Sequence, residues 1–199
     1  MRVPRGEGRP TTLECVAVYG NEIELDTGRN LGRPVLLRKP STTNVAEGSH
    51  IIKKGDWYYL FTAEGGTGDA HQEWVFRSKS PLGPYETGPD CPIVFNDQDM
   101  LVRTTGHMDI LQDSSEQWWG VMLGTRPQLD SNGNLLDSHL GRETFLVPIT
   151  WSSSGWPVVN DRKAVSPLGW AANRPIAKQL DLPLWYDEFD QGTLTQLAE

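Results

Sequence analysis

The sequence predicts an all-β protein, and two observations carry this prediction. Eight Trp residues accompany 20 Gly and 14 Pro in a chain of 199 residues, a balance of aromatic and turn-forming residues that suits many short strands better than long helices. Strand-like pairs separated by polar turns also recur along the chain. This recurrence favours the separate blades of a propeller over one continuous sandwich.

The expected strands share apolar or aromatic residues bounded by Gly, Pro, Asn, Asp or Ser turns. In chain order they cover residues 13–19, 22–25, 34–38, 50–53, 57–62, 73–78, 92–95, 106–112, 118–124, 143–151 and 156–159. Three hairpins stand out, around 50–62, 106–124 and 143–159. We interpret each hairpin as the centre of one blade, which gives about three blades.

Charge and length exclude several classes of protein. The formal net charge of -8, without a compensating basic patch, predicts that nucleic acid is not a partner. No apolar run approaches the length needed to span a bilayer, so no membrane partner is expected. Cys15 and Cys91 are too few for a disulfide scaffold or a zinc site, and the first ten residues do not resemble a signal peptide. The compartment stays open.

Three separated motifs are informative when taken together and in order. They are Glu47-Gly48-Ser49-His50 before a Tyr-Tyr strand, Thr105-Gly106-His107-Met108-Asp109, and Leu140-Gly141-Arg142-Glu143-Thr144-Phe145-Leu146. Jointly they resemble glycoside hydrolase family 43, the five-bladed β-propeller β-xylosidases and α-L-arabinofuranosidases. The resemblance covers roughly residues 32–160. It implies hydrolysis of xylosyl or arabinosyl linkages in plant cell-wall polysaccharides or oligosaccharides, such as xylan, with inversion of configuration.

Inversion requires a general acid and a general base on opposite faces of the sugar, about 6.5–9.5 Å apart. By resemblance, Glu47 matches the general acid, which must carry a proton at the working pH. Arg142 matches the arginine that binds the sugar. His107 matches the histidine that contacts a calcium ion at the propeller centre, directly or through water; no organic cofactor is implied.

The chain departs from the family pattern in two ways. Ser49 stands where proline is usual, which loosens the backbone beside Glu47. The family's base and its tuning aspartate lie upstream of the acid, but only 46 residues precede Glu47 here and Asp26 is the one aspartate among them. Because Asp26 sits in an ordinary turn sequence, neither role is assigned to it.

The resemblance also sets the expected domains. Residues 1–160 form a partial glycosidase propeller of about three blades, 161–183 a linker and 184–199 the start of a truncated C-terminal β-sandwich. The chain is therefore expected to be a fragment of the family fold.

Plainer interpretations stand beside these roles. His107 suits a hydrogen-bonded core position, Arg142 suits a surface ion pair with Glu143, and His50 and His71 are taken as structural. The alternative function is a non-catalytic sugar-binding or structural propeller fragment, inactive because the upstream carboxylates are missing.

Overall fold

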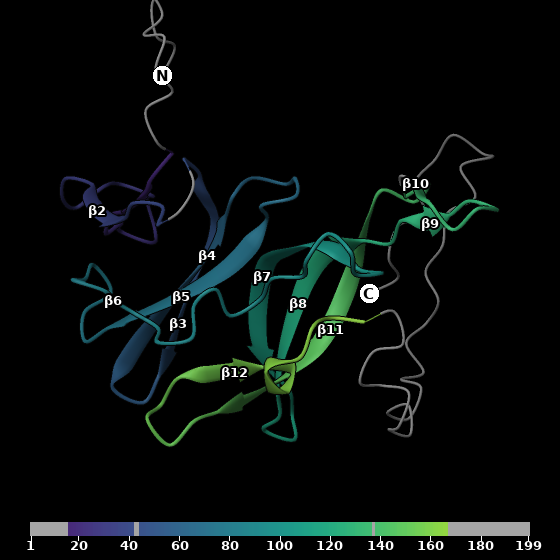
Figure 1. Cartoon of the computed structure of the whole chain (residues 1–199). Coiled ribbons are helices and arrows are strands. Elements are labelled where there is room, and N and C mark those ends of the chain that lie inside the picture. The colour runs from purple at the N-terminus through teal and green to yellow at the C-terminus, as the bar shows by residue number, and fades with distance from the viewer. Residues whose placement is uncertain (1–15, 42–43, 137, 167–199) are drawn as a thin grey trace, which may run out of the picture.

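The computed structural model describes residues 16–41, 44–136 and 138–166 and shows two four-stranded antiparallel sheets side by side, with two small two-stranded sheets (Figure 1). The strands are β1 (Val18–Gly20), β2 (Val35–Arg38), β3 (Ala46–Lys54), β4 (Trp57–Glu64), β5 (Gln72–Ser78), β6 (Glu86–Thr87), β7 (Arg103–Gln112), β8 (Trp118–Thr125), β9 (Gln128–Leu129), β10 (Leu135–Leu136), β11 (Arg142–Trp151) and β12 (Pro157–Val159). One 3-10 turn, η1, covers Asn160–Arg162. The all-β prediction is confirmed.

The first sheet has the order β3-β4-β5-β6 and contains the hairpin expected around Gly55. Its β4 strand is buried along most of its length, because both faces of the sheet are covered. Phe61 faces the second sheet, whereas Leu60 packs with Phe76 and Leu37 on the β1–β2 side. This sheet is one complete blade.

The second sheet has the order β12-β11-β8-β7, so it unites the two hairpins that we assigned to separate blades. β8 pairs with β7 along one edge and with β11 along the other. Gly120 of β8 leaves room for the Met108 side chain of the neighbouring strand β7, since a Cβ there would lie 2.4 Å from the Met108 sulfur. Two complete blades are therefore described, and β1–β2 is a separate two-stranded piece beside the first.

The core lies between the two sheets. Its buried side chains come from both blades and from the segments after β6 and β12, and they are Tyr59, Phe61, Val75, Val94, Val102, Met108, Ile110, Met122, Val147, Ile149, Trp156, Val159 and Val165. Since this cluster joins the blades, neither sheet would bury its inner face alone.

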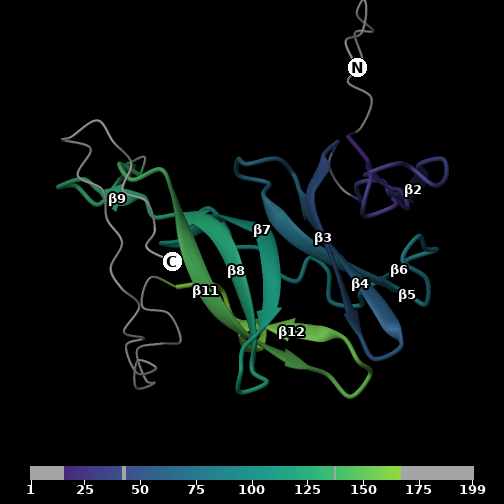
Figure 2. The ribbon, with the colours of Figure 1, turned by 180° about the vertical axis from the view of Figure 1, so that it is seen from behind.

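Arg77 connects the two blades at the end far from β9 and β10. The β11–β12 hairpin passes beneath the first sheet in both views (Figures 1 and 2). Nη1 of Arg77 donates to the Ser154 carbonyl at 2.7 Å, and its guanidinium lies over the rings of Trp57 and Trp156, 4.3 and 4.1 Å from their centroids. The Tyr59 hydroxyl donates to the Gly155 carbonyl at 2.5 Å beside it.

The first strands of the two blades, β3 and β7, contact each other where both depart from regular pairing. The β3 register shifts between Glu47 and His50, and the β7 register shifts twice between Arg103 and Asp109. Gly48 has a φ of +56°, and a Cβ on it would lie 2.5 Å from Nε2 of His107. The bulges thus bring the segment after Glu47 directly against the His107 ring.

The expected linker at 161–183 lies mostly, and the sandwich segment at 184–199 entirely, outside the described residues. Among the residues that the structure does describe, no helix has the length and apolar character needed to cross a bilayer.

Replacing Arg77 with Leu should lower the free energy of unfolding by about 2 kcal/mol, because the blades lose a partly buried charged hydrogen bond and two cation–π contacts. Arg126→Leu is the control, since it removes an exposed ion pair with Glu143 that solvent screens. Urea unfolding followed by fluorescence measures both. Equal losses in the two variants would contradict the role of Arg77.

Replacing Gly48 with Ala should destabilise the fold more than Gly55→Ala does. Both glycines have nearly the same φ, +56° and +57°, but an added Cβ meets the His107 ring at Gly48 and nothing within 4 Å at Gly55. The backbone penalty of about 1–2 kcal/mol is therefore shared, and the excess at Gly48 reports the ring contact. Thermal unfolding of both variants measures it; equal losses would mean that the ring moves aside freely.

Candidate functional site

Glu47 lies at the start of β3 and is exposed, with Gly48 following it in the bulge. The strand pairing of Glu47 with Ala63 fixes its backbone, and the left-handed conformation of Gly48 turns the chain immediately afterwards. The residue that follows Glu47 packs on His107, because a Cβ on Gly48 would overlap the His107 ring.

His107 occupies a strained backbone conformation. Its φ is +54°, a region that costs energy for a residue with a side chain, and Thr104 at +51° is similar. Both lie in the irregular parts of β7, and the His107 side chain is exposed although Met108 beside it is buried. His107 is therefore not the core histidine of the plainer interpretation.

Arg142 begins β11 opposite Thr125 of β8, and Arg103 of β7 pairs with that same Thr125. The residue is exposed. The alternative interpretation, an ion pair between Arg142 and Glu143, is not seen, because Glu143 binds Arg126 through contacts of 2.5 and 2.8 Å. Arg126 in turn holds the pKa of Glu143 below its usual value, mainly through these hydrogen bonds.

His71 joins the three predicted residues electrostatically. It is 1% exposed, and its Nδ1 lies 2.8 Å from the Thr104 carbonyl, so Nδ1 carries the proton and Nε2 keeps a lone pair. Burial lowers the pKa of His71, the Thr104 carbonyl opposes this, and the charges of His107, Glu47 and Arg142 also act on the ring. The main effect is burial, which disfavours the charged form of the His71 ring.

Glu73 is a second buried group behind the site. It is 0% exposed, and one carboxylate oxygen accepts the backbone N–H of Met108 at 2.9 Å. Burial raises the pKa of Glu73 well above its usual value, while the N–H groups of Met108 and His107 act in the opposite direction. Its other oxygen, like Nε2 of His71, has no hydrogen-bond partner within the described part of the chain.

Sequence reasoning missed both of these residues. It treated His71 as structural and gave Glu73 only a place in a strand. A signal was present, because Glu73 directly precedes the apolar run Trp74-Val75-Phe76, where a carboxylate is normally excluded from the interior. Nothing local, however, indicated that both side chains reach across to β7.

The calcium ion expected near His107 stays a prediction. Calcium takes six to eight oxygen ligands. Over residues 16–41, 44–136 and 138–166 no cluster of three or more His, Cys, Asp or Glu side chains is suited to a metal, and His107 offers a nitrogen. A calcium ion near His107 would therefore need backbone carbonyls or water as further ligands.

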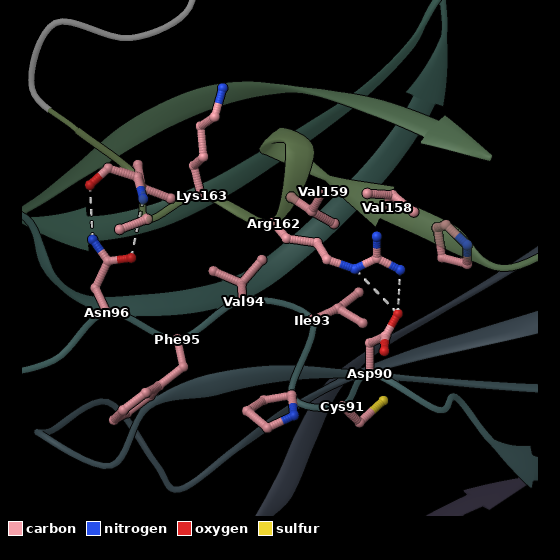
Figure 3. A pocket seen from close by; sticks show the side chains of 14 residues that line it. Asp90, Cys91, Ile93, Val94, Phe95, Asn96, Val158, Val159, Arg162 and Lys163 are labelled. Carbon is pink, nitrogen blue, oxygen red and sulfur yellow. Dashed lines mark hydrogen bonds and ion pairs between the residues drawn. The ribbon is translucent and has the colours of Figure 1, made fainter. Parts of the chain in front are cut away.

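A cavity of about 500 Å³ lies elsewhere, between segments 90–96 and 157–165 (Figure 3). Its polar side chains are engaged with the protein: Asn96 bonds the backbone of Val102 and Val165, and Arg162 pairs with Asp90 at 2.5 Å. Burial raises the pKa of the Cys91 thiol to about 11, which keeps it protonated and unreactive. This cavity contains none of the predicted site residues.

Comparison with known proteins agrees with the three motifs. Residues 9–157 match the model of glycosyl hydrolases family 43. A non-reducing end alpha-L-arabinofuranosidase of Bacteroides ovatus is 45% identical over 150 residues, which are 74% of this chain and 27% of the relative. A beta-xylosidase of Bacillus subtilis is 32% identical over 173 residues, 82% of this chain and 32% of the relative.

The solved structure of a Bacteroides ovatus protein, titled xyloglucan PUL GH43B, is 36% identical with a TM-score of 0.70, covering 90% of this chain and 35% of that one. The chain thus spans about a quarter to a third of the length of these relatives. Its two four-stranded sheets are blades of a partial five-bladed β-propeller. The chain belongs to family 43 of the glycosyl hydrolases.

Proposed function

We propose that this chain is the part of a xylosidase or arabinofuranosidase that carries the general acid, Glu47, and the sugar-binding Arg142. The observation that supports it most is the packing of Gly48, which follows Glu47, on the His107 ring. Arg142 of β11 and Arg103 of β7 both pair with Thr125, so β7 and β11 begin at the same end of the second sheet, and β3 contacts β7. The names of the relatives, an arabinofuranosidase and a xylosidase, suggest the substrate class.

In the proposed reaction, the Glu47 carboxyl donates its proton to the glycosidic oxygen as the bond from the anomeric carbon to that oxygen breaks. The Arg142 guanidinium donates hydrogen bonds to sugar hydroxyls and holds the ring in the cleavage position. A base on the opposite face activates water, which attacks with inversion. Asp26 does not supply this base, because it lies in an exposed turn before β2.

The rival proposal is sugar binding without turnover. One observation favours it: the Glu47 side chain is exposed. A carboxylate in water gives up its proton, whereas a general acid needs a covered site or a neighbouring negative charge to keep it. The two proposals differ in whether product forms.

The test compares this chain with a version extended at its N-terminus by the upstream part of the Bacteroides ovatus relative. The extended protein should release nitrophenol from a xyloside or an arabinofuranoside. Glu47→Gln should lower kcat by about 10²–10⁴-fold on poorly leaving sugar substrates, because proton donation is lost. Glu116→Gln is a control, since Glu116 lies in the exposed turn between β7 and β8.

Product release that does not change in the Glu47 variant would overturn the assignment of the acid. Calorimetry with xylo-oligosaccharides distinguishes hydrolysis from binding alone. If the extended protein binds these sugars but releases no product under any condition, the non-catalytic proposal is supported. Inversion is checked by proton NMR of the first anomer released.

A further inference from the structure

The strained segment that carries His107 is held from behind by Glu73 of the neighbouring blade. The β7–β8 pairing passes from Gly106–Leu123 to Asp109–Val121, so His107 and Met108 are skipped by the regular register. Backbone N–H groups that lose a strand partner inside a protein need another acceptor. The carboxylate of Glu73 accepts the Met108 N–H at 2.9 Å, and the neighbouring His107 N–H also lowers the pKa of Glu73 against the effect of burial.

Glu73 can serve as an anchor because its own backbone is fixed on both sides. It pairs with Ala63 of β4 on one edge. On the other edge its N–H donates to the Val94 carbonyl at 2.9 Å, and its carbonyl accepts the Ile93 N–H at 2.8 Å. A carboxylate projecting from such a position has little freedom to follow a movement of β7.

His71 acts on the other irregular part of β7. It lies two residues before Glu73, so the two side chains emerge on the same side of the chain, and its Nδ1 lies 2.8 Å from the Thr104 carbonyl. The segment from Thr104 to Met108 is therefore held at both ends by one short stretch of the other blade.

We infer that Glu73 is a positioning residue: its buried carboxyl holds the N–H group of Met108, which keeps the adjacent His107 ring against Gly48 and thereby orients Glu47. The inference deepens the proposed function and rests on it for its catalytic consequence. The structural part, however, concerns only contacts within this chain.

Glu64 provides a matched control. It is also 0% exposed and lies on the same sheet, but its carboxylate accepts from Arg38 at 3.1 Å and from the Ser41 N–H at 2.7 Å. Removing that carboxylate should weaken the fold generally without releasing β7.

The first experiment needs no substitution. NMR of the labelled chain should detect a scalar coupling across the hydrogen bond between the Met108 amide nitrogen and the Glu73 carboxyl carbon. A Met108 amide that exchanges as fast as an exposed loop amide, with no coupling, would overturn the inference whether or not any variant folds.

The second experiment compares amide hydrogen exchange at Met108 in three variants. Glu73→Leu removes the acceptor and should lower protection by about tenfold or more relative to Glu64→Leu. Glu73→Gln keeps a carbonyl acceptor and should stay within about threefold of the original chain. Equal protection in Glu73→Leu and Glu64→Leu would show that Glu73 does not hold the segment.

The catalytic part is measured in the extended protein described above. Glu73→Leu should lower kcat by about a hundredfold with a smaller change in KM, and Glu73→Gln should restore most of it, because the bound sugar is positioned by Arg142 while the acid is misplaced. An unchanged kcat in Glu73→Leu would overturn the catalytic consequence. The two claims can fail separately. If hydrogen exchange responds as expected but the extended protein with Glu47 and Glu73 unchanged has no activity, Glu73 still positions β7, and the proposed function is wrong.

Discussion

The candidate site depends on one close approach between blades, that of Gly48 to the His107 ring. A Cβ on Gly48 would overlap the imidazole at 2.5 Å, so only glycine allows β3 and β7 to meet here. Both residues also have positive φ values, +56° and +54°. Two bulged strands therefore fit each other at the point where regular strands would keep Glu47 and His107 apart.

Core packing and polar contacts elsewhere in the molecule stabilise this irregular contact. A continuous core joins the sheets, and the Arg77 contacts fasten their opposite end. Behind the bulges, His71 and Glu73 offer polar partners to backbone groups that the strand ladder leaves out. Backbone strain at a functional site persists only when its surroundings determine it in this way.

Much of the fold could be predicted from local pattern. The Gly55 hairpin, the apolar β4 strand and the hairpins around 106–124 and 143–159 are all present. The number of complete blades was not predictable from the same pattern, because a hairpin looks alike whether it stands alone or adds to a sheet. β8 pairs with strands both before and after it, so two hairpins became one blade.

The sequence by itself determined the family and the all-β class and supplied three candidate site residues, Glu47, His107 and Arg142. It could do so because a sequence motif is recognised from consecutive residues, without knowledge of what lies beside it in space. Only the tertiary structure decided that His71 and Glu73 lie behind them and that Glu143 pairs with Arg126. The physical reason is that a side chain's partner across two sheets depends on register and bulges, which are fixed by packing of the whole fold rather than by adjacent residues.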